Sequence, residues 1–238
     1  MTTLYLIRHG QASFGQENYD QLSELGQQQA THMGNVLAKR VPNFDAVCLG
    51  TMLRHQQTAS NCLEGFEKVS AQTDLASDAV FDAGWNEYDH QDILRQYRPE
   101  FITSKSMMEY ISQQADPKQA FEADFNGAIN RWIAGEHDRD YVETWRAFTS
   151  RVHQALKTTL ASNADKKRIA VFTSGGPISL ITQHLLGVPE EKIMQMNWTL
   201  LNCGVTKVVS TGSRLFVASL NEHTHFEAAE HKHFITYT

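Results

Sequence analysis

Three short segments of this chain combine reactive or anion-binding side chains with the end of an apolar run. They are Arg8-His9-Gly10, Thr51–Arg54 and Ser174-Gly175-Gly176-Pro177. An imidazole can attack phosphorus and carry the group as a phosphohistidine, and guanidinium groups bind phosphate oxygens in pairs and offset their charge. A glycine-rich turn at the start of a helix offers backbone N–H groups to an anion. These residue types indicate phosphoryl-transfer chemistry.

A fourth segment supplies carboxylates to the same chemistry. Trp85-Asn86-Glu87-Tyr88-Asp89 contains two acids, and a carboxylic acid can protonate a leaving oxygen and later activate water. Asp82 and Asp92 lie close by in the sequence, so a plain solvated acidic loop is the alternative interpretation.

Apolar periodicity predicts the elements that position these segments. Continuous apolar runs at Leu4–Ile7, Ala46–Leu49 and Arg168–Thr173 are typical of strands buried on both faces of a parallel sheet. In such sheets ligands collect at the carboxyl ends of the strands, which is where the first three segments fall. Two further strands, Gly204–Val209 and Leu215–Leu220, are predicted to form a hairpin.

Helices are predicted between these strands. One begins after the N-cap Ser23 and ends near Arg40, before Pro42; a second covers about 53–63; a third covers 178–186, with Pro177 in its first turn. Strands that alternate with helices at these intervals predict an α/β fold. We expect a three-layer sandwich with a mostly parallel central sheet.

Residues from about 83 to 150 have a different character. They contain many aromatic residues and few β-branched runs, with helical periodicity at Phe121–Ile133 and from Val142 to about Leu160. Pro117 and the Gly135–Asp140 stretch are the expected breaks. We interpret the chain as one domain, 1–238, with this helical cap inserted over the carboxyl ends of the strands.

Composition limits the classes of function. The chain has 238 residues and a net charge of −6, which gives no electrostatic reason to expect nucleic acid or an anionic membrane as a partner. Three widely spaced cysteines argue against a disulfide scaffold, and neither a signal peptide nor a long apolar segment is visible, so a cytoplasmic protein is expected. The sequence contains no P-loop, no dinucleotide-binding turn and no serine-hydrolase elbow.

The spacing of several motifs resembles the histidine phosphatase superfamily, the phosphoglycerate mutase-like proteins. The similar segments are Leu6-Ile7-Arg8-His9-Gly10-Gln11, Leu22-Ser23-x-Leu25-Gly26-x-x-Gln29-Ala30, Leu53-Arg54-x-x-Gln57-Thr58-Ala59, Asn202-x-Gly204-Val205-Thr206 and Asn221–His225. An Arg-His-Gly triplet alone is a weak match, but together with the later arginine segment it is a specific one.

The resemblance implies a role for each candidate residue. His9 would be the nucleophile, Arg8 and Arg54 would bind the transferred phosphate, and Glu87 would be the general acid. Further phosphate contacts would come from Gln11, Asn18, Ser174 and Gly175. The family uses neither a metal nor a bound cofactor for hydrolysis, so none is expected.

One position departs from the family pattern. The family normally has a second histidine where this chain has Ser174. A serine can donate a hydrogen bond to phosphate but brings no positive charge, and losing one well-placed donor typically costs about 10²–10³ in rate. We expect slow or selective hydrolysis, with the hypothesis that His55 lends charge from beside Arg54. Ser174 can also serve only as a turn residue and N-cap.

Paired histidines near the end of the chain raise a separate question. His223-x-His225 and His231-x-His233 have the alternation that would place each pair on one face of a strand, which is metal-like spacing. No cysteine lies nearby and His225 belongs to a family-like segment, so no metal site is predicted.

The sequence predicts a phosphomonoesterase that acts on a phosphorylated small molecule or phosphopeptide through a phosphohistidine on His9. Two alternatives stay open: a catalytically weak member of the fold that binds a phosphorylated ligand, and, less favoured, a phosphoglycerate mutase. A homodimer is compatible with the sequence but is not specified by it.

Overall fold

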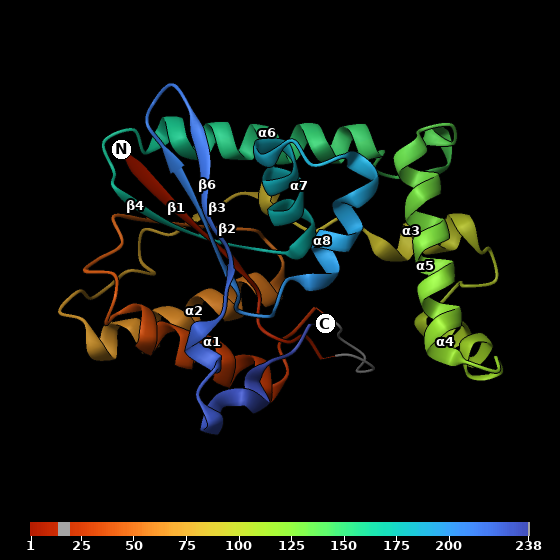
Figure 1. The fold of residues 1–238 in the computed structure, drawn as a ribbon, viewed down its shortest axis with the longest axis horizontal. Coiled ribbons are helices and arrows are strands. Elements are labelled where there is room, and N and C mark those ends of the chain that lie inside the picture. The colour runs from red at the N-terminus through yellow and green to blue at the C-terminus, as the bar shows by residue number, and fades with distance from the viewer. Residues whose placement is uncertain (14–19, 238) are drawn as a thin grey trace. The chain divides into compact units, whose positions relative to one another are not determined.

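A six-stranded sheet forms the centre of the computed structural model, which describes residues 1–13 and 20–237 (Figure 1). The strand order is β3-β2-β4-β1-β5-β6. In chain order the strands are β1 (Thr2–Arg8), β2 (Ala46–Leu49), β3 (Val80–Phe81), β4 (Arg168–Thr173), β5 (Val205–Ser210) and β6 (Leu215–Glu222). The mixed α/β fold with a mostly parallel sheet is as predicted.

The pairing of the strands brings the predicted strand ends to one edge of the sheet. β1, β2, β3 and β4 are parallel to one another, with Arg8 opposite Thr173 and Leu49 opposite both Phe172 and Phe81. β5 runs antiparallel to β1, and Val205 at its start pairs with Ile7. The chain therefore leaves four strands and enters a fifth at the same edge.

Helices cover both faces of this sheet. Figure 1 shows α1 (Glu24–Leu37) and α2 (Leu53–Val69) on one side, and α6 (Trp145–Ser162) and α7 (Gly175–Leu186) on the other, which gives the three layers expected. α8 (Ile193–Thr199) follows α7. Among the described residues, none of these helices combines the length and apolar character needed to cross a bilayer.

Backbone-to-backbone packing fixes α1 against α2. A Cβ atom on Gly34 would lie 2.0 Å from the carbonyl oxygen of Cys62, and one on Gly65 would lie 2.3 Å from that of Thr31. Only glycine permits so close an approach. The apolar side chains of α1, α2, β1 and β4 then form a continuous core that includes Met33, Phe66 and Phe172.

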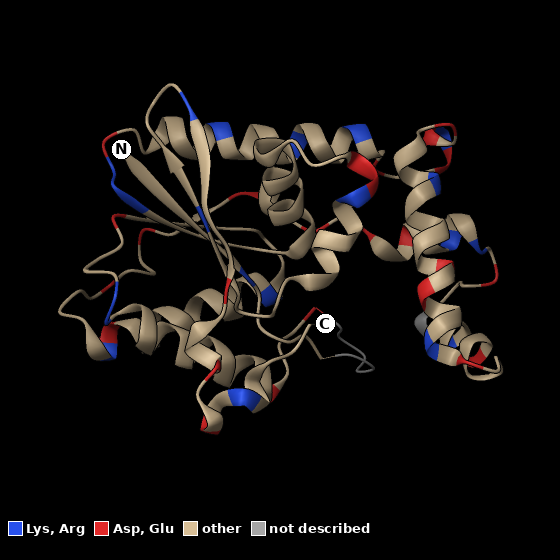
Figure 2. Cartoon of the chain, viewed as in Figure 1, with Lys and Arg blue, Asp and Glu red and all other residues tan. Residues whose placement is uncertain are grey.

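Residues Tyr88–Arg151 form a second compact unit, and Met1–Glu87 with Val152–Thr238 form the first. The second unit contains α3 (His90–Tyr97), α4 (Ser104–Ser112), α5 (Pro117–Ala134) and the first residues of α6. Tyr88, Trp132, Trp145 and Phe148 pack edge-on or tilted within it, at ring centroid distances of 5.1–5.8 Å. These four aromatic residues thus form part of the core of this unit. Its predicted position over the strand ends stays a prediction. Charges of both signs are spread over both units (Figure 2).

Several predicted helix limits are wrong. α2 continues to Val69 rather than stopping near residue 63, because Cys62 and Phe66 continue its buried face. The break at Pro117 is confirmed, because α4 ends at Ser112 and Pro117 opens α5, where proline lacks only an N–H that the first turn leaves unpaired. α6 begins at Trp145 rather than Val142, whereas the break at Gly135 is confirmed by its left-handed φ of 72°.

The histidine-rich tail is not a strand. Thr224–Phe226 and Ala229–Phe234 are short 3₁₀ helices, so the alternation of histidines does not place them on one strand face. The other 3₁₀ helices of the described residues are Ala83–Trp85, Asp138–Asp140 and Glu190–Lys192.

Candidate active site

The main chain of His9 is held from both sides at the end of β1. Its N–H donates to the Thr173 carbonyl at 2.9 Å, and its carbonyl accepts from the Asn202 side-chain amide at 3.1 Å and from the Cys203 N–H at 3.3 Å. Only 6% of the residue is exposed. The neighbouring parallel strand and the segment that leads into β5 therefore fix where the imidazole can point.

One hydrogen bond sets the tautomer of His9. Its Nδ1 lies 2.8 Å from the carbonyl oxygen of Gly10, its own neighbour in the chain. A carbonyl oxygen only accepts, so Nδ1 carries the proton and Nε2 keeps its lone pair. The reactive nitrogen of a phosphohistidine mechanism is thus in its nucleophilic form.

The surroundings of His9 keep the ring neutral. Burial is the largest effect that lowers the pKa of His9 well below its usual value of 6.5, and the charges of Arg54 and Arg8 and the nearby His55 lower it further. The hydrogen bond to Gly10 opposes these effects only in part. The lowered pKa and the Nδ1 hydrogen bond both indicate that His9 is an uncharged imidazole near the guanidinium groups of Arg8 and Arg54.

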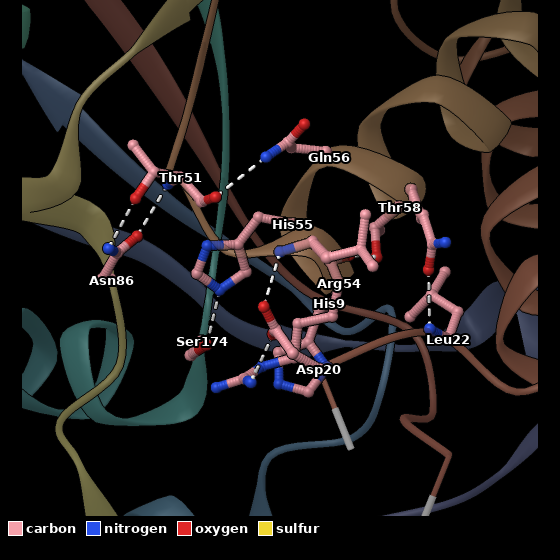
Figure 3. A network of polar contacts seen from close by, with 12 residues as sticks. His9, Asp20, Leu22, Thr51, Arg54, His55, Gln56, Thr58, Asn86 and Ser174 are labelled. Carbon is pink, nitrogen blue, oxygen red and sulfur yellow. Dashed lines mark hydrogen bonds and ion pairs between the residues drawn. The ribbon is translucent and has the colours of Figure 1, made fainter. Parts of the chain in front are cut away.

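Asp20 holds Arg54 in place. The Arg54 Nη1 donates to Asp20 Oδ1 at 2.8 Å, and the N–H of Leu53 donates to the other oxygen of the same carboxylate at 2.8 Å (Figure 3). The Arg54 side chain is 5% exposed and that of Asp20 is 36% exposed. Asp20 thus orients the guanidinium and also caps the first turn of α2. It takes the place of a side-chain cap from Met52, the N-cap residue, which makes no such hydrogen bond.

Thr58 links the same helix to the His9 turn. Its hydroxyl accepts from the Gly10 N–H at 3.0 Å and donates to the Arg54 carbonyl at 2.6 Å. The residue is fully buried. The hydroxyl therefore ties the His9-Gly10 turn to the turn of α2 that carries Arg54.

Arg8 reaches from the end of β1 toward the last residues described. Its Nη1 donates to the carbonyls of Leu200 and Tyr237, the latter at 2.9 Å. Its Nε is 3.6 Å from the place where a Cβ of Gly175 would stand. Arg8 and Gly175, which lie far apart in the sequence, are thus neighbours at the strand ends.

Ser174 directly follows β4 and is fully buried, and its side chain makes no capping hydrogen bond to α7. Its Oγ instead lies 2.6 Å from Nε2 of His55 (Figure 3). The rings of His55 and His9 have centroids 5.9 Å apart. Ser174 thus has the backbone position of an N-cap, while its hydroxyl contacts His55 rather than the helix. A phosphate contact by Ser174 stays a prediction.

Glu87 has a different setting from the acids around it. Its Oε2 accepts from the N–H of Gly176 at 3.0 Å, so this amide of the glycine turn is already occupied. Asp82 and Asp89 cap their own short helices, and Asp92 accepts hydrogen bonds from Arg95, Gln96 and Val142. Glu87, unlike the other three, thus contacts the turn between β4 and α7.

The remaining predicted contacts are less closely tied to the site. The Gln11 side-chain oxygen accepts from the Ser23 hydroxyl at 2.9 Å, which joins it to the start of α1. Asn18 lies outside the described residues. Phosphate contacts by Gln11 and Asn18 stay predictions.

Two of the four tail histidines contact backbone atoms through their rings. His223 Nδ1 contacts the Asn221 carbonyl at 2.7 Å, and His225 Nε2 contacts the Cys203 carbonyl at 3.1 Å. Within the described ranges, 1–13 and 20–237, no three His, Cys, Asp or Glu side chains are grouped so that they could hold a metal ion.

Sequence reasoning missed Asp20, Thr58 and Asn202 as parts of this site. Thr58 and Asn202 lie inside motifs that the sequence had singled out, so their presence there was a usable signal. Asp20 had none, because its partner Arg54 is 34 residues away.

Residues 4–223 match the family model of the histidine phosphatase superfamily, branch 1. Because this match covers nearly the whole chain, the protein belongs to that superfamily. A search of curated protein sequences finds no significant match.

Solved structures share the fold at low sequence identity. A phosphoserine phosphatase mutant from Entamoeba histolytica, in complex with phosphoserine, is 19% identical over 94% of this chain and 99% of its own, with a TM-score of 0.62. A phosphoglycerate mutase from Bacillus anthracis is 17% identical over 94% of each chain, with a TM-score of 0.63. An alpha-ribazole phosphatase from Shigella flexneri is 20% identical over 93% of this chain and 96% of its own, with a TM-score of 0.62. These likenesses define the fold.

Proposed function

We propose that this protein is a phosphomonoesterase that acts through a phosphohistidine on His9. The observation that carries the proposal is the Nδ1 contact with the Gly10 carbonyl, which leaves Nε2 unprotonated in a buried setting beside two arginines. Nε2 attacks phosphorus as the bond from phosphorus to the substrate oxygen breaks. Arg8 and Arg54 offset the charge of the phosphate oxygens.

Glu87 is the proposed general acid and base. It protonates the leaving oxygen in the first step, then takes a proton from the water that attacks the phosphohistidine, and His9 leaves as a neutral imidazole. The hydrogen bond from Gly176 supports this role because it holds the carboxylate at the turn that also carries Ser174 and Gly175. Those two residues are the proposed phosphate contacts from β4–α7.

The proposed substrate class is a phosphorylated small molecule or phosphopeptide. Structural relatives whose names refer to phosphoserine and alpha-ribazole phosphate chemistry make small phosphate monoesters reasonable first substrates. The three cysteines are free and buried, which suits a reducing compartment such as the cytoplasm. A homodimer stays a prediction.

Hydrolysis of an aryl phosphate by wild type and His9→Ala tests the proposal. We expect turnover in wild type and at least a roughly thousandfold loss in the variant, since the variant has no nucleophile. Brief mixing followed by mass spectrometry at alkaline pH should find the added phosphoryl group on the His9 peptide. Turnover that survives His9→Ala would contradict the mechanism.

A second candidate is a binding protein with little turnover, and Ser174 is the observation that favours it. The site has both arginines but lacks the cationic side chain that the family pattern has at this position. Phosphate binding without His9-dependent hydrolysis would identify this case. A mutase is less favoured, because it must retain and return the phosphoryl group.

A further inference from the structure

The site contains a second imidazole that enters from α2 rather than from β4. His55 follows Arg54 in the first turn of α2 and is fully buried. Its ring lies 5.9 Å from that of His9, centroid to centroid, and its Nε2 lies 2.6 Å from the Ser174 hydroxyl (Figure 3). The strand end that resembles the family's histidine position thus has a serine in contact with a histidine from another element.

The surroundings of His55 assign its proton. Nδ1 is buried and has no hydrogen-bond partner among the residues the structure describes. It lies against Gly50, where a Cβ would stand only 2.2 Å from it. Buried N–H groups without an acceptor are rarer than unpaired acceptors. The proton therefore belongs on Nε2, which donates to Ser174 Oγ.

This assignment sets the direction of the serine hydroxyl. Ser174 Oγ accepts the proton of His55, so its own hydrogen is available for another acceptor. A phosphate oxygen is such an acceptor, and the turn that carries Ser174 also carries Gly175, beside Arg8. Hydrogen bonds in a chain polarise one another, so a serine held by an imidazole is a stronger donor than a serine alone.

We propose that His55 and Ser174 form a relay in which His55 orients and polarises the Ser174 hydroxyl, and that hydroxyl binds an oxygen of the transferred phosphoryl group. The relay deepens the phosphatase proposed above and rests on it. His55 is a positioning residue, because it acts through Ser174. Neither His55 nor Ser174 gives up a proton, so the relay works while His9 and His55 are both neutral.

A double-mutant cycle tests the relay, with kcat/KM for para-nitrophenyl phosphate as the first measurement. Ser174→Ala should lower kcat/KM by about 10²–10³, and His55→Ala by about 10–10². The double variant should be no slower than Ser174→Ala, because His55 acts only through the hydroxyl. His55→Gln keeps an N–H donor and should recover part of the loss.

The relocation variant His55→Ala/Ser174→His gives a sharper result. It returns an imidazole to the end of β4 and empties the space that His55 fills, so it should be faster than His55→Ala. The matched control is His153→Ala, because His153 is a half-buried histidine on α6 beside His184. This variant should behave as wild type. Thermal melts of every variant separate loss of fold from loss of function.

The affinity of each variant for orthophosphate, measured by calorimetry, tests the relay without turnover. The test of the relay is therefore independent of the test of the proposed phosphatase. If turnover does not depend on His9, the proposed function fails, and the relay is then judged by binding alone. The relay requires His55→Ala and Ser174→Ala to weaken phosphate binding, with no further loss in the double variant. Wild-type phosphate affinity in folded His55→Ala, or fully additive losses, would overturn it.

Discussion

Two neighbouring imidazoles in this site carry their protons on opposite nitrogens. His9 contacts a carbonyl through Nδ1, which exposes the lone pair of Nε2, whereas His55 contacts a hydroxyl through Nε2. Burial is the main effect that lowers the pKa of both rings well below 6.5. With both rings neutral, Arg8 and Arg54 are the positive charges beside His9, and the proposed mechanism assigns them to the phosphate. A single hydrogen-bond partner thus fixes the tautomer of each ring, and with it the role proposed for each side chain.

His225 should make the protein sensitive to acid. Burial, opposed by its hydrogen bond to Cys203 and assisted by His32, His223 and Arg40, lowers its pKa to about 4. The unfolded chain takes up a proton near pH 6.5, whereas the folded protein does so only near 4, so stability falls as the pH falls through this window. At pH 5 the loss from His225 is about 2 kcal/mol.

Urea unfolding of wild type and His225→Gln at pH 7 and pH 5 measures this loss. Glutamine keeps an N–H for the Cys203 carbonyl but does not titrate. Other histidines contribute equally to both proteins, so the difference isolates His225. The variant should lose less stability than wild type on acidification. An equal loss would contradict the lowered pKa of His225 as a source of acid sensitivity.

Helix α2 forms one wall of the site with its first two turns. Arg54, His55 and Thr58 lie there, and each is buried and contacts a different segment. The helix has no side-chain cap of its own at Met52, and Asp20 supplies one from outside. The position of Arg54, the proposed phosphate-binding arginine, therefore depends on Asp20, which precedes α1.

Asp20→Asn should strengthen phosphate inhibition and weaken the fold. The amide keeps an oxygen for Leu53 or Arg54 but removes a negative charge that competes with phosphate for the guanidinium. We expect the inhibition constant of orthophosphate to fall roughly fivefold, and the free energy of unfolding to fall by about 1 kcal/mol. Glu64→Gln on the exposed face of α2 is the charge-matched control. Weaker phosphate inhibition in Asp20→Asn would contradict this role.

Gly34→Ala should destabilise the α1–α2 contact even though alanine favours helices. The new Cβ would meet the Cys62 carbonyl at 2.0 Å, and neither helix backbone can yield cheaply. We expect the free energy of unfolding to fall by about 1–3 kcal/mol. Gly127→Ala in α5 is the matched control, because its Cβ meets the far end of one side chain, the hydroxyl and ring carbons of the partly exposed Tyr97, which can move away, and no backbone atom among its nearest neighbours. That variant should gain up to about 1 kcal/mol, and equal effects in urea unfolding would refute the packing argument.

Across the molecule, the positions of the strand ends were predictable from the sequence, but the hydrogen bonds that connect them to distant segments were not. Leu4–Ile7 and Arg168–Thr173 specify strands through local apolar runs, and parallel pairing then places Arg8 and Ser174 at one edge. His55 and Ser174 are 119 residues apart, and the amide of Asn202 holds a carbonyl 193 residues away. Such contacts depend on how layers pack, which no local pattern encodes. The antiparallel position of β5 beside β1 is likewise set by the sheet as a whole.

Phosphate analogues should stabilise the sheet-containing unit in particular. Every site residue described here belongs to 1–87 or 152–238, so binding is linked to the unfolding of that unit. Orthovanadate at about 100 times its dissociation constant adds about 2.7 kcal/mol, which corresponds to a rise in Tm of roughly 5–10 °C. Differential scanning calorimetry should find this shift in wild type and not in Arg54→Ala.

A shift with His9-dependent turnover supports the phosphatase, and a shift without turnover supports the binding protein. If vanadate moved neither the melting of this unit nor that of the whole chain, Arg8 and Arg54 would not form an anion site, and both proposals would fail together.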